Sequence, residues 1–305
     1  MRALFHAIIL LISASFAAAQ ECPSLSPVEQ ARSIDRNLLG GIPTDGEVLV
    51  RRGYVAEYDA RHRTPRWVAW RALPSYRETP RRDGRWSSFR ADPDVPNPVV
   101  TRDYNGLYAS EDNFARGHLA PYFISGGDRD GDGLLAAGPD GETPLDIDDQ
   151  CAVYEFNYMT NIAPQYHRRF NGFERGEGEG LWYQLESQVR AMVDSGRSFH
   201  IIAGTIYGGD AVQFVGPESD IGVPDMFYKV VIGDEGAVAF LFAHRRQLDA
   251  SACLLDAELA DCIAPVEMIE SLTGLDFLRH LPDPIEHAIE QTDGRQIWAE
   301  WSERH

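Results

Sequence analysis

Apolar residues recur at helical spacing in several segments of the chain. Residues 181–196 (LWYQLESQVRAMVDSG) carry apolar side chains at this spacing and stop at a glycine, which predicts an amphipathic helix. Residues 26–41 begin with a serine suited to an N-cap and end in Gly-Gly, so they predict a short helix. Residues 264–278 predict a further capped helix, and residues 283–305 predict a polar helical tail.

Other segments have the composition of buried strands. Residues 48–59 and 66–73 are rich in Val, Tyr and Trp and flank the polar turn 60–65, which predicts a β-hairpin. Residues 199–209 and 225–244 predict buried strands, the second of them with a turn at its Asp-Glu-Gly. Strands and helices interleave irregularly, without an internal repeat or a domain-length linker. The pattern therefore predicts one α+β domain.

Two stretches show neither the helical spacing of apolar residues nor the composition of a strand, and we expect both to be long irregular loops. Residues 77–100 are rich in Pro, Asp and Arg, and residues 125–150 are acidic and rich in glycine. The second stretch contains DRDGDG, whose alternating aspartates match the first half of an EF-hand calcium loop. These aspartates are Asp128, Asp130 and Asp132.

The second half of that calcium loop is missing, because the twelfth position is Pro139 instead of glutamate. Asp140 or Glu142 could complete a Ca²⁺ site in its place. The alternative is an acidic surface turn without an ion.

The first residues have the features of a secretory signal peptide. Residues 1–19 combine Arg2, a short apolar core and three alanines before Gln20. No later stretch approaches the ~20 apolar residues of a membrane span. We therefore expect a secreted or periplasmic protein with no membrane partner.

Four cysteines follow the signal peptide, and an even number in an exported chain favours disulfides. Cys253 and Cys262 are close in sequence and form the favoured pair, which leaves Cys22 with Cys151. The sequence alone allows three connectivities. Neither a CxxC nor a Cys/His cluster indicates structural zinc.

The net charge of −19 argues against a polyanion-binding protein, but the charges are unevenly distributed. The segment from Arg51 to Arg90 contains eleven arginines and only four acidic residues, a local balance of +7. Lys229 is the only lysine, so nearly all positive charge lies on guanidinium groups suited to phosphate. The segment is either a solvated face or a track for a nucleic-acid backbone.

Four short polar motifs follow one another along the chain. RGHLAP (116–121) precedes NIAPQ (161–165), FN (170–171) and WYQLE (182–186). Taken singly, asparagines at turns and one glutamate on a helix are ordinary capping and solvated residues. As an ordered set, together with strand-like and helix-like segments across residues 41–282, they resemble the DNA/RNA non-specific endonucleases, a ββα-metal (His-Me finger) nuclease family.

The resemblance implies a role for each motif. His118 corresponds to the general base, a task that suits a group titrating near neutral pH. Asn171 corresponds to the single direct protein ligand of Mg²⁺, for which Mn²⁺ is an alternative, and Glu186 to the acid that holds the metal's waters. Arg116 corresponds to a clamp on the scissile phosphate.

Further residues are matched less directly. A second family arginine lies upstream of the histidine and matches best to Arg85, with Arg81, Arg82 and Arg90 close by. A supporting structural role is implied for two amide side chains of the second motif, Asn161 and Gln165.

The sequence departs from the family pattern at two places. The residue before Arg-Gly-His is Ala115, where the family usually has aspartate; that acid is supporting, so we expect activity to survive. Asn171 and Glu186 are fifteen residues apart, which is longer than the family spacing. The intervening acids then compete with Glu186 for the metal-water role. They are Glu174, Glu177 and Glu179.

The resemblance implies a ββα-metal fold with an antiparallel-rich sheet flanked by helices. Its domain would cover residues 41–282, between an N-terminal helical extension (20–40) and a C-terminal helical tail (283–305). The implied activity is Mg²⁺-dependent cleavage of DNA and RNA without sugar preference, and a homodimer is compatible with it. The alternative is a catalytically weak protein of this fold that binds extracellular nucleic acid or another polyanion. No GxSxG or HExxH motif supports a protease.

Overall fold

The computed structural model describes residues 22–174, 178–292 and 294–303. The expected signal peptide lies outside these residues. Among them, no helix is both long and apolar enough to cross a bilayer.

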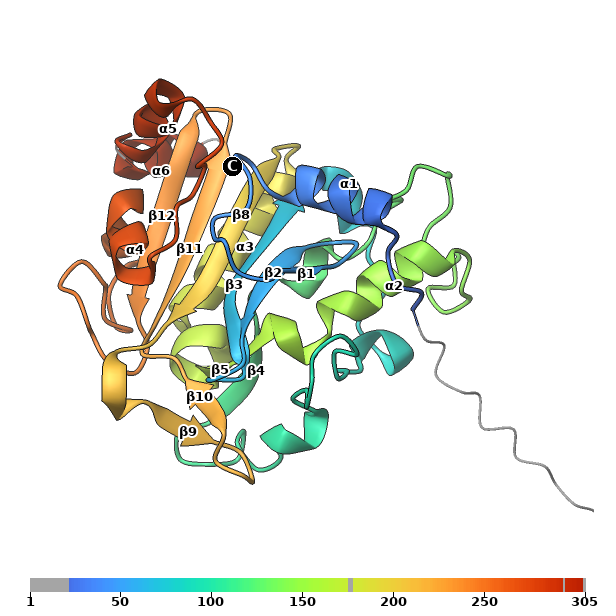
Figure 1. Ribbon diagram of the computed structural model, residues 1–305, viewed down its shortest axis with the longest axis horizontal. Helices are drawn as coiled ribbons and strands as arrows, with labels where there is room; N and C mark the ends of the chain where they lie inside the picture. Colours follow the sequence, from blue (N-terminus) through green and yellow to red (C-terminus); the bar gives the residue numbers. More distant parts are fainter. Residues whose placement is uncertain (1–21, 175–177, 293, 304–305) are drawn as a thin grey trace, which may run out of the picture.

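A seven-stranded antiparallel sheet forms the centre of the molecule, with the strand order β1-β2-β3-β8-β11-β12-β13 (Figure 1). The strands are β1 (Leu49–Val50), β2 (Val55–Asp59), β3 (Thr64–Ala72), β8 (Phe199–Ile206), β11 (Met226–Gly233), β12 (Gly236–Ala243) and β13 (Ile263–Ala264). Both predicted hairpins, β2–β3 and β11–β12, are confirmed. The α+β class and the antiparallel sheet are confirmed as well.

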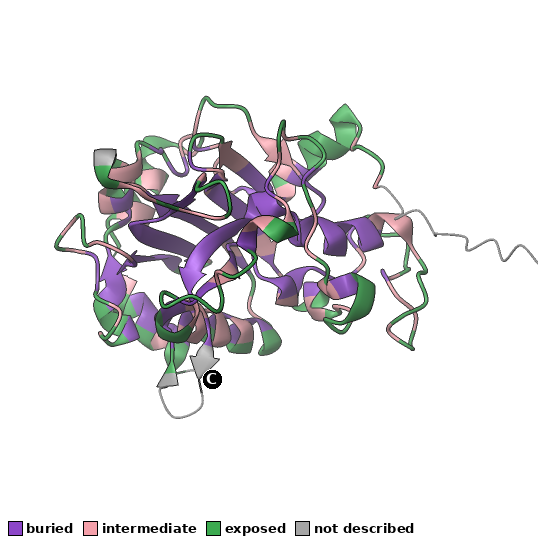
Figure 2. Ribbon diagram, turned by 90° about the horizontal axis from the view of Figure 1, so that it is seen from below, coloured by how far each residue is buried: buried purple, intermediate pink, exposed green. Residues whose placement is uncertain are grey.

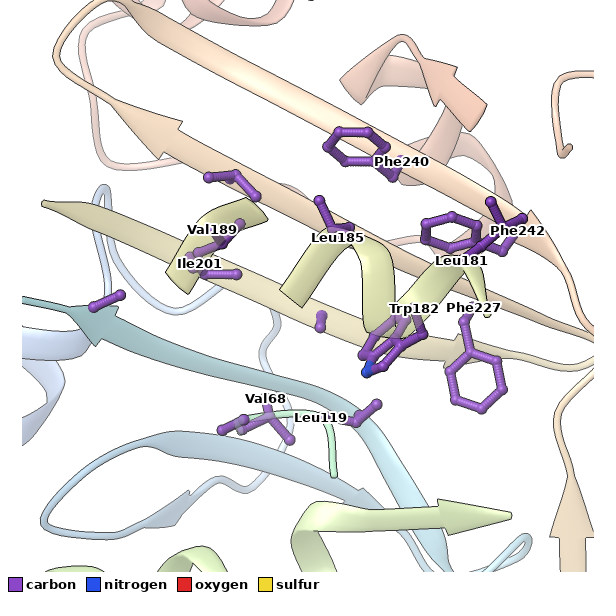
Figure 3. Close-up of a cluster of buried hydrophobic side chains, with 14 of the residues drawn as sticks. Val68, Leu119, Leu181, Trp182, Leu185, Val189, Ile201, Phe227, Phe240 and Phe242 are labelled. Atoms are coloured by element: carbon purple, nitrogen blue, oxygen red, sulfur yellow. The ribbon is translucent and has the colours of Figure 1, made fainter. Parts of the chain in front are cut away.

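Helices cover both faces of this sheet, and each face has its own apolar core. The helices are α1 (Pro27–Asn37), α2 (Ile147–Phe156), α3 (Leu181–Asp194), α4 (Val266–Thr273), α5 (Asp283–Glu290) and α6 (Gly294–Ser302). Trp182, Leu185 and Val189 of α3 pack on one face, with strand residues such as Phe227 and Phe240 (Figure 3). Helix α4 packs on the opposite face through Val266 and Ile269. The sheet is therefore buried between exposed helices and loops (Figure 2).

The predicted helix at residues 26–41 is confirmed but shorter. Ser26 caps α1 in a reciprocal arrangement with Glu29, and the helix ends at Asn37. Gly40 and Gly41 both have positive φ, so the chain turns there instead of continuing the helix.

The C-terminal tail forms two helices, α5 and α6, instead of one polar helix. Ile297, Trp298 and Trp301 of α6 are buried against the same core as α3. The tail is therefore part of the folded unit.

Helix α2 was not predicted, and its first residues fall in the stretch 125–150 that was expected to be irregular. From Asp149 to Phe156 every residue of α2 is buried, so no polar face marks a helical period in the sequence. Its acidic start, with Asp146 as N-cap, is indistinguishable in composition from the acidic loop before it.

Two disulfides join the cysteine pairs favoured from the sequence. Cys22 is bonded to Cys151 of α2, and Cys253 to Cys262.

Three small antiparallel pairs lie outside the main sheet. They are β4 (Phe114–His118) with β5 (Ile162–Tyr166), β6 (Phe173–Glu174) with β7 (Gly178–Glu179), and β9 (Gln213–Val215) with β10 (Ile221–Val223). The β4–β5 pair and α3 together carry the motifs singled out in the sequence.

Candidate active site

Strand β4 ends in the Arg116-Gly117-His118 motif, paired with the Ile162–Pro164 stretch of β5. Gly117 faces the side chain of Gln165. A Cβ at Gly117 would overlap the amide group of Gln165, so only glycine allows this approach. The glycine between the arginine and the histidine is therefore required by packing across the strand pair.

His118 is buried, with 9% of its surface exposed. Its Nε2 lies 3.3 Å from Oδ1 of Asn157, the C-cap residue of α2. The amide nitrogen of Asn157 donates to the Trp86 carbonyl at 3.0 Å, which directs Oδ1 toward the imidazole. The Nε2–H therefore donates to Asn157, and Nδ1 keeps its lone pair for accepting a proton.

The environment of His118 favours the neutral imidazole. Burial lowers its pKa to about 3, and the positive charge of Arg82 acts in the same direction, while the bond to Asn157 opposes both. At neutral pH, His118 is therefore uncharged and able to act as a base.

Arg82 is the arginine of the 81–90 stretch that interacts electrostatically with both His118 and Glu186. Its guanidinium lies over the rings of Tyr122 (5.3 Å) and Phe89 (5.7 Å), and burial lowers its pKa. Arg82 therefore reaches the site through packing on aromatic rings.

Arg85, the arginine matched from the sequence, is exposed. It lines a separate pocket with Trp86, Asp140 and Glu142. Its assignment to the site remains a prediction; Arg82, also exposed, is the one electrostatically linked to His118 and Glu186.

Arg116 is also supported by aromatic rings. It lies 5.3 Å from the Phe89 ring and 5.8 Å from the Tyr104 ring, and donates to the Thr101 carbonyl. Within the described residues, no carboxylate lies at salt-bridge distance from Arg116 or Arg82. Most of their donors are therefore available to an anion.

Asn171 ends a π-helical turn, His167–Asn171, closed by a 2.8 Å bond from Gly172 N–H to the His167 carbonyl. Its amide nitrogen donates to Oε1 of Gln165, which lies against Gly117. The carbonyl oxygen of Asn171, the atom expected to bind the metal, is not used by this bond. The π-turn thus connects Asn171 to the strand that carries His118.

Asn161 fixes the chain just after His118. Its amide oxygen accepts from Ala120 N–H, and its nitrogen donates to the carbonyls of Ala120 and Phe156, each at 2.9 Å. These contacts are the kind that a supporting residue makes, because they involve backbone alone.

Glu186 lies on α3 and forms an ion pair with Lys229, at 3.3 Å. Lys229, on β11, is fully buried, and its ammonium lies 3.8 Å from the Trp182 ring. Burial lowers the pKa of Lys229, and Glu186 opposes the shift. In the sequence, Lys229 stands out as the sole lysine, and its place inside an apolar strand is the signal that could have assigned it to the site.

Arg190 was also missed. It follows Glu186 by one helical turn, so both side chains lie on the same face of α3. Its Nε is buried without a hydrogen-bond partner, and its guanidinium lies 4.6 Å from the Phe123 ring. The four-residue spacing was the available signal.

The acids that compete with Glu186 receive little support. Glu177 lies outside the described residues, and so does the side chain of Glu174. Glu179 is exposed, just before the N-cap of α3. Glu186 is the acid that is electrostatically linked to Arg82.

The three aspartates of the DRDGDG loop do converge. Their ligand oxygens lie within 4.8 Å of one another. Asp128 accepts hydrogen bonds from Gly131 and Gly133 N–H, which lower its pKa. Asp140, one candidate for completing the site, instead accepts bonds from its own turn, which lower its pKa to about 2.

The segment Arg51–Arg90 does not form one basic surface. Six of its eleven arginines form salt bridges within the protein. The most buried are Arg51 with Asp92 and Arg52 with Glu155. These salt bridges offset about half of the positive charge of the segment, so its arginines do not lie along the surface as one continuous track.

An antiparallel strand pair followed by a helix, with a buried histidine, a half-buried asparagine and ring-supported arginines, defines a hydrolytic nuclease type of site. The sequence profile of DNA/RNA non-specific endonucleases matches residues 40–284, and the chain belongs to this family.

Named relatives and a solved structure agree with this family. The chain is 26% identical to the mitochondrial nuclease EXOG of Danio rerio over 64% of this chain, a match that spans half of that protein. It is 26% identical to a nuclease of Nostoc sp. over 93% of this chain and 94% of the relative. Human mitochondrial endonuclease G is 26% identical over 79% of this chain and 72% of its own length. A chain in the crystal structure of the EndoG/EndoGI complex has the same fold, with a TM-score of 0.58 and 20% identity over 85% of this chain and 95% of that one.

Proposed function

We propose that this protein is a metal-dependent endonuclease that hydrolyses phosphodiester bonds of DNA and RNA without sugar preference. The observation that carries the proposal is the buried, neutral imidazole of His118, with Nδ1 available beside two arginines that lack carboxylate partners among the described residues. A base and an anion-binding group are thereby combined at one strand end.

The residues present fit a hydrated Mg²⁺ ion, with Mn²⁺ as the alternative. The carbonyl oxygen of Asn171 would be the direct ligand, and the Glu186 carboxylate would hold its waters. Nε2 of Gln165 is a buried N–H donor without a partner, which fits a hydrogen-bond acceptor at this place, such as a water held by the ion. When bound, the ion would supply a positive charge for the phosphate and for the leaving oxygen.

In the proposed reaction, Nδ1 of His118 takes a proton from the attacking water. The water oxygen bonds to phosphorus, and the bond from phosphorus to the 3′ oxygen breaks. The 3′ oxygen leaves with the bonding electron pair and takes a proton from water, which gives a 3′-hydroxyl end and a 5′-phosphate end. Arg116 and Arg82 hold the charge that develops on the phosphate oxygens. Base readout is not expected, because arginine contacts to the backbone are sequence-independent.

Export and a second cation are further parts of the proposal. The signal-like residues 1–19 and the two disulfides support a secreted or periplasmic protein. The converging aspartates of the DRDGDG loop support Ca²⁺ binding there. DNA and RNA are the proposed partners, and a homodimer remains compatible with them.

Plasmid and RNA digestion test the proposed function directly. Wild-type protein should nick supercoiled plasmid and degrade RNA with Mg²⁺, and EDTA should stop both reactions. The matched control is Asn161→Asp, which alters a supporting amide near the site. Because Asn161 contacts backbone alone, any activity that this variant loses should be lost together with its fold. A folded, metal-loaded wild type that binds DNA without cutting it would favour the alternative, a binding protein.

A further inference from the structure

A pocket of about 550 Å³ lies beside the turn that carries Asn171. Four of its lining residues are arginines, drawn from two distant segments of the chain. They are Arg168, Arg169, Arg245 and Arg246. The first two belong to the π-turn His167–Asn171, so the pocket adjoins the proposed metal ligand.

Asp225 orients the two arginines of the second segment. This carboxylate is fully buried and accepts from Arg246 Nε and Nη2, at 2.9 and 2.8 Å. It also pairs with Arg245, and Gly208 N–H donates to it at 2.8 Å. A guanidinium fixed in this way loses little side-chain entropy when it binds an anion.

The other two arginines project from the π-turn and are exposed. The Arg169 guanidinium lies 4.7 Å from the Tyr166 ring, which supports it without using its hydrogen-bond donors. Glu179 and Asp256 also line the pocket and Asp225 pairs with two of its arginines, so arginines outnumber carboxylates there by four to three. In a chain with a net charge of −19, this is a local excess of positive charge.

The N-terminus of α3 completes the pocket wall. Gly180, its N-cap, lines the pocket and offers no side chain to the first N–H groups of this 14-residue helix. These groups carry a partial positive charge and favour an anion. The arginines and the helix end therefore favour the same kind of ligand.

We propose that this pocket binds a backbone phosphate of the substrate strand, at a distance from the bond that is cut. The inference rests on the proposed nuclease function. Gly180 precedes Glu186 by six residues, which corresponds to about 9 Å along the helix. The bound phosphate therefore belongs to a nucleotide near the scissile one, on the side of the pocket.

The test removes the two exposed arginines together, as Arg168→Ala with Arg169→Ala. The control removes two exposed arginines elsewhere, Arg32→Ala with Arg61→Ala, and so changes net charge equally. Each protein is assayed on a 30-base-pair duplex and on bis(p-nitrophenyl) phosphate, a diester with no neighbouring phosphate. The 30-base-pair length is about three helical turns, enough to fill the site.

For the pocket variant, kcat/KM on the duplex should fall roughly tenfold or more, and the salt dependence should flatten by about one unit per lost contact. Turnover of the small diester should stay within about twofold, because the chemistry is untouched. The control should match wild type on both substrates.

Three results would overturn the inference. The pocket variant could match wild type on the duplex, or lose both substrates equally, which would mean that its arginines act only through Asn171. Inorganic phosphate could bind to wild type and not to the variant while duplex cleavage stays equal, which would make the pocket a free-phosphate site. If wild type cuts nothing, the nuclease proposal fails instead of this inference. The salt slope of duplex binding then tests the pocket: a flatter slope for the variant than for wild type supports a phosphate contact there, and equal slopes rule it out.

Discussion

Arginines in two regions of this protein are held in different ways. Between residues 51 and 77, five of the seven arginines pair with carboxylates, as Arg52 does with Glu155 and Asp148. Around the β4–β5 pair and α3, they lie on aromatic rings, as Arg82, Arg116 and Arg190 do. A carboxylate offsets the charge of a guanidinium and takes up some of its donors, whereas a ring leaves all of them for a ligand. Arginine density along a sequence is therefore a poor guide to where a polyanion binds.

The largest effect should come from the base at the centre of the ring-supported group. His118→Ala should lower plasmid nicking by roughly 10²–10⁴-fold, the range for losing a general base. DNA binding should persist, because the arginines remain, and circular dichroism should show an intact fold. Nicking within threefold of wild type would remove His118 from the mechanism.

A carboxylate-paired arginine should matter for stability instead. Arg52→Ala leaves Glu155 buried without its cation, which should cost about 3–5 kcal/mol of unfolding free energy in urea titrations. The salt slope of DNA binding by the folded variant should equal that of wild type. If Arg52→Ala flattened the salt slope of DNA binding and left the unfolding free energy unchanged, Arg52 would be a DNA-binding residue and not a structural one.

A ring-supported arginine should show the opposite behaviour. Arg116→Lys keeps the charge but loses the planar fork, and a charged hydrogen bond is worth about 1.5–3 kcal/mol. The value of kcat/KM on DNA should therefore fall by about tenfold or more, with thermal stability nearly unchanged. Arg63→Lys, at an arginine paired with Asp220, is the matched control and should leave kcat/KM at the wild-type value.

The Lys229–Glu186 pair combines both modes of support, since Lys229 contacts a ring and a carboxylate. If the lysine positions the glutamate, Lys229→Met and Glu186→Gln should not be additive. A double-mutant cycle on kcat/KM should give a coupling free energy of about 0.5–3 kcal/mol. Additive effects would show that the two side chains act separately.

The last comparison concerns a histidine held among rings. His244 accepts from Tyr166 N–H and contacts the Pro224 carbonyl through Nδ1, and burial lowers its pKa to about 3. In the unfolded chain this histidine binds a proton at about pH 6.5, whereas in the native state it stays neutral down to about pH 3. The free energy of unfolding therefore falls as the pH drops from about 6.5 toward 3. His244→Gln should reduce this slope by up to about 1.4 kcal/mol per pH unit, measured as unfolding free energy. Equal slopes in both proteins would contradict the assigned neutral state.

The main sheet and α3 could be predicted because the order of apolar and polar residues in each segment reflects how the segment is buried. The β2–β3 and β11–β12 hairpins have β-branched and aromatic runs around a polar turn, and α3 has a clear helical period. Helix α2 could not, because it is buried on every side and begins inside an acidic loop. Local composition carries no signal for such a helix.

At the site, the sequence allowed us to predict motifs that lie along one strand or helix. It did not allow us to predict contacts between segments that are distant in the chain. His118, Asn171 and Glu186 stand in ordered motifs, although their roles remain predictions. The sequence could not separate Arg82 from Arg85, because the rings of Phe89 and Tyr122 pack beside Arg82 only in the fold. The pairing of Lys229 with Glu186 depends in the same way on how α3 crosses β11.

The Cys22–Cys151 bond gives the chain a covalent ring, because it joins residues 129 positions apart. Strands β1 to β4 and His118 lie inside this ring, and Asn171 and Glu186 lie outside it. The exposed acidic loop, with Gly131 to Leu134, is also inside. A protease that cuts this loop therefore releases no fragment: both new ends stay attached through the sulfur bridge and through the packed sheet. Such a nicked molecule would migrate as one species on a non-reducing gel and as two after reduction.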